Sequence, residues 1–183
     1  MIATSELVKN TLANANPANA EDAFQRVIKQ AKQANIMFLI QQANIRASEL
    51  NSDIIKEFNL LVKDINADQK GKLMENIEVS AYASPDGGFD LNDKLAEQRE
   101  KNAAGYVDKQ LKKDKIETNV DSKYTAQDWE GFKELVSKSN IQDKDIILRV
   151  LSMYQDPEQR ETEIKNISSV YKDLADEILP QLR

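Results

Sequence analysis

A five-residue segment at positions 84–88, Ser-Pro-Asp-Gly-Gly, constrains the fold more than any other part of the chain. Pro85 fixes φ for a turn, and two consecutive glycines permit positive φ, so neither a helix nor a strand is expected to run through it. Before this segment, residues 75–83 alternate between apolar and polar side chains, which predicts a half-buried strand. After it, residues 90–111 show helical spacing. The chain is therefore expected to pass from strand to helix through a short loop.

The remaining patterns predict further alternation of helices and strands. Helical spacing is seen over residues 21–33 and 50–65, the second with Asn51 or Ser52 as its N-cap. A dense apolar run at 35–40 predicts a buried strand, and residues 116–124 alternate weakly, as a strand would. This order predicts an α/β (α+β) domain with two layers.

The two ends of the chain differ from this pattern. Residues 1–20 are small, polar and interrupted by Pro17, and are expected to form an arm or linker ahead of a domain spanning 21–183. Residues 125–183 predict three helices and an added helical layer. The first starts at a capping-box-like segment at 125–128, and the last starts at Asp156 and Pro157 and stops at Pro180.

Composition removes several classes of function. The 183 residues include no cysteine and no histidine, which excludes a cysteine nucleophile, a Ser–His–Asp triad and nearly every zinc site. The net charge of −6 argues against nucleic-acid partners, which require a basic surface. The apolar run at 36–40 is too short to span a bilayer. No signal peptide opens the sequence, so either the protein is cytoplasmic or an export signal has been removed.

The segment at 77–111 resembles the OmpA-like peptidoglycan-binding domain of Gram-negative bacteria. That family has a strand, a loop with Asp, Gly and Asn, and a helix with Leu and Arg at fixed spacing. Gly87 and Asn92 match the loop, and Leu95 and Arg99 match the helix. The Ala-Ser-Pro-Asp-Gly sequence at 83–87 is similar to a branch of the family in which such a loop replaces the usual one.

The resemblance implies a fold and a function. The fold is a two-layer sandwich of a mixed β-sheet with helices on one face. A helical insertion at 125–183 follows. In the family a final strand comes next, and the sequence ends where it would begin, so the expectation is either a sheet without that edge strand or a truncated sequence. The function is that of a non-catalytic periplasmic module without a cofactor, which anchors an outer-membrane protein to the cell wall. Its ligand is the diaminopimelate group of the peptidoglycan stem peptide.

The resemblance also implies the site residues. In the family, an Asp in the loop takes the ligand's ammonium and the helix Arg takes its carboxylate, as a guanidinium fork allows. Arg99 keeps the second position, while Ser84 holds the Asp position. A hydroxyl cannot offset the ammonium charge, and losing a charged partner commonly costs about 1.5–3 kcal/mol. Asp86 is the candidate replacement carboxylate, with the Gly87–Gly88 backbone adding amide donors.

Other interpretations stay open beside this one. The 84–88 loop is also typical of an ordinary surface turn, Arg99 of a salt-bridged helix residue, and Asn92 of a helix cap. Asp86 and Asp90 lack the ligand spacing of a calcium loop, so no metal is expected. The alternative function is a protein–protein interaction or assembly module that has lost wall binding and uses its C-terminal helices as the partner surface.

Overall fold

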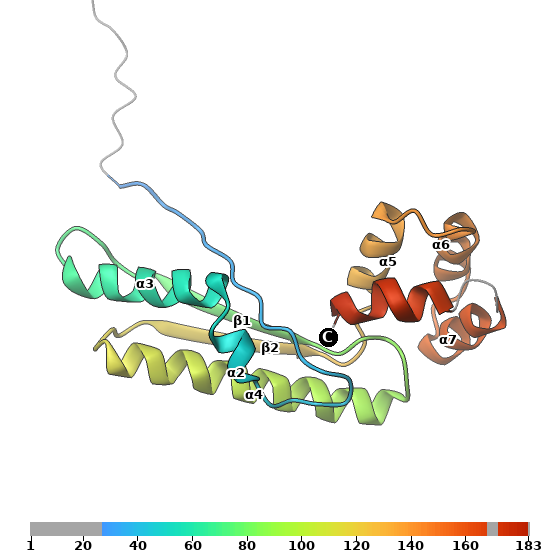
Figure 1. Cartoon of the computed structure of the whole chain (residues 1–183), viewed down its shortest axis with the longest axis horizontal. Helices are drawn as coiled ribbons and strands as arrows, with labels where there is room; N and C mark the ends of the chain where they lie inside the picture. Colours follow the sequence, from blue (N-terminus) through green and yellow to red (C-terminus); the bar gives the residue numbers. More distant parts are fainter. Residues whose placement is uncertain (1–26, 168–171, 183) are drawn as a thin grey trace, which may run out of the picture. The chain divides into compact units, whose positions relative to one another are not determined.

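The computed structural model describes residues 27–167 and 172–182 of the chain (Figure 1). Internal contacts divide the chain into two units, Met1–Lys32 and Gln33–Arg183, and every element described below belongs to the second. The predicted arm at 1–20 lies outside the described residues, as do residues 21–26 of the first predicted helix.

The first half of the second unit is built around two strands. α2 (Ala47–Leu50) and α3 (Asp53–Ala67) precede β1 (Asn76–Tyr82), and α4 (Phe89–Lys113) connects β1 to β2 (Asn119–Thr125). The two strands are parallel, with Ile77 beside Val120. α4 contacts both strands, so the β1–α4–β2 unit places the ends of both strands next to the start of α4 (Figure 1).

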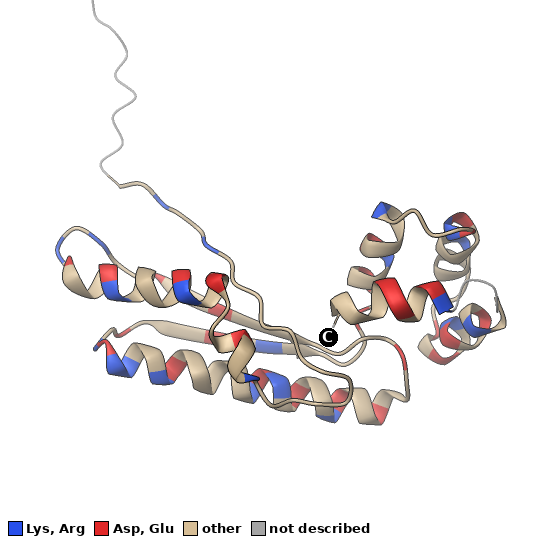
Figure 2. Ribbon diagram, in the orientation of Figure 1, with Lys and Arg blue, Asp and Glu red and all other residues tan. Residues whose placement is uncertain are grey.

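The core of this half lies between the helices and the inner face of β1. Val79 and Ala81 alternate with more exposed residues along β1 and are buried, as the period of two predicts. Buried side chains on the helices complete the core: Ile55, Val62 and Ile65 on α3, and Ala96 and Leu111 on α4. Lysines and acidic residues are interspersed along the outer surfaces of α3 and α4 (Figure 2), which is typical of helices with one face in water.

The predicted combination of helices and strands is confirmed, but two predicted elements are wrong. Residues 27–33 are exposed and not helical, because an isolated amphipathic segment gains little helical stability without a packing partner. Residues 35–40 form no strand. Side chains, rather than a neighbouring strand, form hydrogen bonds with this backbone. Glu49 accepts from the Met37 amide, and Arg99 donates to the Leu39 carbonyl. In the described residues the sheet has only β1 and β2, so the expected mixed sheet is not seen there.

The second half is helical and has its own apolar core. It consists of α5 (Trp129–Lys138), α6 (Lys144–Met153), α7 (Pro157–Asn166), a π-helix (Leu174–Ile178) and a 3₁₀ helix (Leu179–Leu182). Its core is formed by buried side chains from all these elements and the α5–α6 loop: Phe132, Val136, Ile141, Ile147, Leu151, Ile164, Leu174, Ile178 and Leu179. The predicted added layer of helices is therefore present, with its own packing.

The helix boundaries differ from the prediction in two places and confirm it in one. The N-cap of α5 is Asp128, which accepts from the Gly131 amide, whereas Thr125 is the last residue of β2. Asp156 caps α7 with Pro157 at its first position, as predicted. The prediction of one helix from Pro157 to Pro180 is wrong, because α7 ends at Asn166 and a separate π-helix begins at Leu174. Pro180 does not mark the stop either, since the 3₁₀ helix runs through it to Leu182.

Candidate functional site

The loop at 83–88 connects β1 to α4 and is tied to the end of β2. The Ala83 amide donates to the Thr125 carbonyl at 3.1 Å, and the Asp128 amide donates to the Ala83 carbonyl at 2.9 Å. Gly87 has a φ of +104°, a conformation that a residue with a side chain rarely adopts, which explains the glycine there. Gly88 has an ordinary φ of −65° and is the N-cap of α4.

Asn92 holds this loop from inside. Its side chain is 4% exposed, and Nδ2 donates to the carbonyl oxygens of Ser84, Asp86 and Gly87 at 3.1, 3.2 and 3.4 Å. Asn92 lies in the first turns of α4 and does not cap it, so the cap interpretation is wrong. Its amide group instead satisfies carbonyls that the turn leaves without backbone partners.

Arg99 lies on the same buried face of α4, two turns after Asn92, and is 1% exposed. Its guanidinium donates to three backbone carbonyls: Nη1 to Tyr82 at 2.9 Å, Nε to Gln42 at 3.0 Å and Nη2 to Leu39 at 3.2 Å. It also lies 4.9 Å from the centroid of the Phe38 ring. Arg99 therefore joins the end of β1 to the segment at 38–42.

The rest of the predicted site faces the helical half. Ser84 is 8% exposed, and Pro85 is fully buried. The Gly87 amide donates to Oε1 of Glu161 on α7 at 2.9 Å. Asp86 lines a small apolar cavity with residues of that half, among them Trp129 and Glu161.

The predicted residues are thus brought together as a loop and its supports. Asn92 contacts the backbone of the loop, and Arg99 contacts the end of the strand that enters it. Asp86, the proposed replacement carboxylate, has different neighbours from Arg99. The segment at 84–88 is a turn, but the interpretation as an ordinary surface turn is wrong, because Ser84 and Pro85 are buried.

A polar cleft lies beside Arg99 and was not predicted. It has a volume of about 430 Å³ and is lined by amide side chains and one lysine: Gln41, Gln42, Asn44, Gln98, Lys101 and Asn102, together with Ala43. Nδ2 of Asn102 donates to the Ala43 carbonyl at 2.8 Å, and Nζ of Lys101 lies 2.6 Å from Oε1 of Glu97. This hydrogen bond and the Glu97 charge raise the pKa of Lys101, which therefore stays protonated at neutral pH.

The amides at 41–44 fall in a segment that sequence analysis placed after a strand. Glutamine and asparagine there show no periodicity, so the only available signal is their density in four consecutive residues. The left-handed backbone of Gln41, with φ of 54°, turns this segment back toward α4 and closes the cleft.

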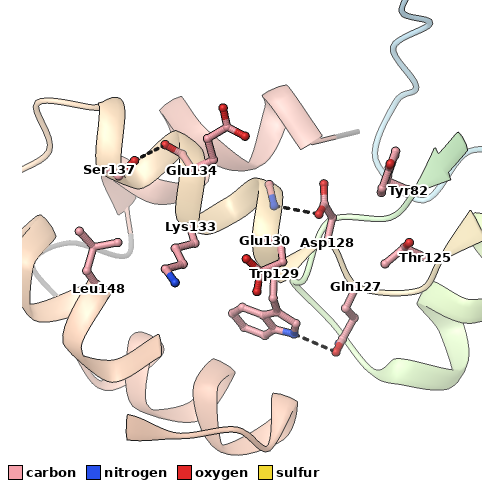
Figure 3. Close-up of a pocket in the computed structure, with 11 residues that line it drawn as sticks. Tyr82, Thr125, Gln127, Asp128, Trp129, Glu130, Lys133, Glu134, Ser137 and Leu148 are labelled. Carbon is pink, nitrogen blue, oxygen red and sulfur yellow. Dashed lines mark hydrogen bonds between the residues drawn. The ribbon is translucent and has the colours of Figure 1, made fainter. Parts of the chain in front are cut away.

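A larger cleft of about 810 Å³ lies beside the start of α5 (Figure 3). Figure 3 shows Leu148 across the cleft from Tyr82 and Thr125, with Trp129 and Asp128 between them. Partial burial raises the pKa of Asp128, and the nearby Glu130 and Glu134 charges raise it further, while its hydrogen bond from the Gly131 amide opposes them. Nε1 of Trp129 donates to Oε1 of Gln127 at 3.2 Å, which fixes the indole at the rim.

Among the described residues, no group of three or more acidic, histidine or cysteine side chains is arranged to hold a metal ion. Over the same part of the chain, no helix has the length and apolar character needed to cross a bilayer.

Comparison of the chain with protein-family models, curated proteins and solved structures gave no match.

Proposed function

We propose that this chain is a non-catalytic module of the bacterial cell envelope. In this proposal it binds the peptidoglycan stem peptide in the periplasm and anchors an outer-membrane protein to the wall. The observation that carries the proposal is the polar cleft at 41–44 and 98–102, which adjoins Arg99, the residue that matches the family's ligand-binding arginine. The ligand then contacts the surface of this cleft. The buried Arg99 side chain holds that surface in place and does not contact the ligand itself.

Lys101, which lines the cleft, and Glu97, its ion-pair partner one turn earlier on α4, together suit a ligand with an ammonium and a carboxylate at one end. Lys101 and Glu97 form an ion pair on α4, with side chains that are 63% and 42% exposed. A zwitterionic group can replace each partner of this pair with its own opposite charge, so Lys101 takes the carboxylate and Glu97 the ammonium. The surrounding amide side chains both donate and accept, which matches the peptide groups of the stem.

Arg99 has a positioning role in this proposal. Its bonds to the carbonyls of Leu39 and Gln42 fix the segment that forms one wall of the cleft. Removing Arg99 would therefore disturb the cleft and the fold together. A test of binding requires a residue that lines the cleft but leaves the core intact.

Lys101 and Lys112 provide a matched pair for this test. Each forms an ion pair with an acidic residue four positions earlier on α4, and only Lys101 lines the cleft. We expect the wild-type chain and Lys112→Glu to sediment with purified insoluble peptidoglycan at moderate salt. Lys101→Glu should bind about tenfold more weakly, through loss of a charged contact. Equal sedimentation of the two variants, or wild type that stays in the supernatant, rules out wall binding at this cleft.

A second candidate is a protein interaction module on an OmpA-like scaffold. It is favoured by the docking of the 84–88 loop on α7 through Gly87 and Glu161, which leaves the loop little room for a wall ligand. Ile146 and Met153 lie two turns apart on one face of α6 and are 48% and 66% exposed. A photo-reactive residue at Met153 should then form one defined crosslink in intact cell envelopes, while the same residue at the exposed Asn140 should not. Identical patterns from both positions reject this surface.

A further inference from the structure

In the part of the chain that the structure describes, no strand pairs with the edge of β2 that faces away from β1. β1 and β2 are the only strands of this sheet within residues 27–167 and 172–182, so β2 has one paired edge and one edge without a strand. All residues of β2 except the half-buried Val120 are exposed. On an unpaired edge, alternate residues direct their amide and carbonyl groups outward, where another strand can bind them.

The two strands together carry two carboxylates, Glu78 and Asp121, and one lysine, Lys123. Asp121 lies beside Glu78 in the parallel register, so two carboxylates are neighbours on one face of the sheet. Lys123 forms an ion pair with Glu78, whereas Asp121 accepts a hydrogen bond from the neutral side-chain amide of Asn119, at 2.8 Å. Like charges at neighbouring positions destabilise a sheet, so a cation placed opposite Asp121 would be favourable.

We propose that the open edge of β2 pairs with β2 of a second copy of this chain, antiparallel and centred on Ser122. In this register Asp121 lies opposite Lys123 of the second copy, and the two-fold symmetry creates the same pair again. Val120 lies opposite Tyr124, a combination of β-branched and aromatic side chains that favours antiparallel pairing. The result is a continuous four-stranded sheet across the dimer.

The charge pattern selects this register against its neighbours. Moving the centre by one residue places Asp121 opposite Asp121 of the second copy, or Lys123 opposite Lys123. A lysine on an edge strand usually prevents pairing, and Lys123 does so in the second of these registers, while the two Asp121 carboxylates repel each other in the first. Of these three registers, only the one centred on Ser122 places Asp121 and Lys123 of each copy opposite a residue of the other sign. The charges therefore favour one symmetric pairing over the other two.

Sedimentation-velocity measurements over a range of concentrations test this proposal. We expect a monomer–dimer equilibrium with a dissociation constant on the order of 0.1 mM, because a seven-residue edge buries less area than a standard interface. Asp121→Lys should raise this constant at least about tenfold, through two like-charge contacts per dimer. Asp108→Lys makes the same change of charge on the exposed side of α4 and should leave it unchanged.

The decisive variant is the exchange Asp121→Lys with Lys123→Asp. It restores opposite charges across the symmetric edge and places the new lysine beside Glu78, so the ion pair within the chain is also kept. We expect this variant to dimerise as the wild type does. A wild-type chain that stays monomeric at about 1 mM, ten times the expected constant, overturns the proposal. Undiminished dimerisation of Asp121→Lys, or a folded exchange variant that remains monomeric, also overturns it.

Discussion

Nη1 of Arg99 donates a hydrogen bond to the carbonyl oxygen of Tyr82 over 2.9 Å, and this bond fastens the middle of α4 to the last residue of β1. The same guanidinium holds the backbone at Leu39 and Gln42, so one buried side chain joins three parts of the fold. A buried charge is costly unless its hydrogen-bonding groups are satisfied, and here carbonyl oxygens satisfy them.

Arg99→Ala should therefore lower the free energy of unfolding by about 3–5 kcal/mol, because it leaves a cavity and three carbonyls without their donor. Arg99→Lys keeps the charge but lacks the planar fork, so it should lose an intermediate amount. Arg149→Ala, at an exposed position on α6, should change stability by less than about 0.5 kcal/mol. Urea unfolding of the three variants measures these differences. Similar values for Arg99→Ala and Arg149→Ala would contradict the structural role.

Asn92→Ala should destabilise the chain by about 1–3 kcal/mol, since buried carbonyls of the 84–88 loop lose their donor. Asn92→Asp should cost at least as much, because a carboxylate cannot donate to carbonyl oxygens. Asn102→Ala removes an exposed amide bond to Ala43 and should cost less than about 1 kcal/mol. Hydrogen exchange at the loop amides, measured beside urea unfolding, should show the loss of protection in the Asn92 variants alone.

Substituting alanine for each of the two adjacent loop glycines should have different effects on stability. Gly87→Ala forces a side chain to a φ of +104° and should destabilise the fold by about 1–3 kcal/mol. Gly88→Ala has an ordinary φ and nothing within 4 Å of the added carbon, so its effect should be within about 0.5 kcal/mol of zero. Thermal unfolding of both variants and the wild type measures this difference in stability. Equal losses would mean that the loop does not hold the backbone conformation described here.

The elements with strong local signals could be predicted from the sequence. β1, α4 and α7 each combine periodicity with a clear boundary, such as the turn at 84–88 or the Asp156–Pro157 start. The segments at 27–33 and 35–40 have the same local patterns but lack packing or pairing partners in the described chain. Periodicity reports a preference for an element, and tertiary contacts decide whether it forms.

The candidate site could be predicted only as a set of positions. The resemblance to the family's motif singles out Asn92 and Arg99, and both lie on the face of α4 that holds β1 and its loop. Their burial depends on segments far away in sequence, since Arg99 bonds to Leu39, 60 residues earlier, and Gly87 bonds to Glu161, 74 residues later. No local pattern encodes such long-range contacts, so the position of Asp86 against the helical half could not be predicted from its place in the loop.

The carboxyl group of Asp128 gives the chain a defined dependence on pH. Partial burial raises its pKa above the usual value, and the neighbouring Glu130 and Glu134 charges add to this effect. The folded state therefore binds this proton more tightly than the unfolded state does. The contribution of Asp128 to stability is unfavourable at neutral pH and becomes less so as the pH falls through the folded pKa toward the unfolded one.

Asp128→Asn isolates this contribution, because an asparagine also caps a helix by accepting from the Gly131 amide. We expect the variant to gain stability relative to the wild type at neutral pH, and this gain to disappear in acid below the unfolded pKa. Urea unfolding of both proteins between about pH 3 and 7 measures the difference. NMR titration of the Asp128 carboxyl should show a lower pKa in Glu130→Gln and Glu134→Gln, and no change in Glu158→Gln on α7. A difference between wild type and Asp128→Asn that stays constant with pH, or grows in acid, would mean that the Asp128 carboxyl is not destabilised by its surroundings.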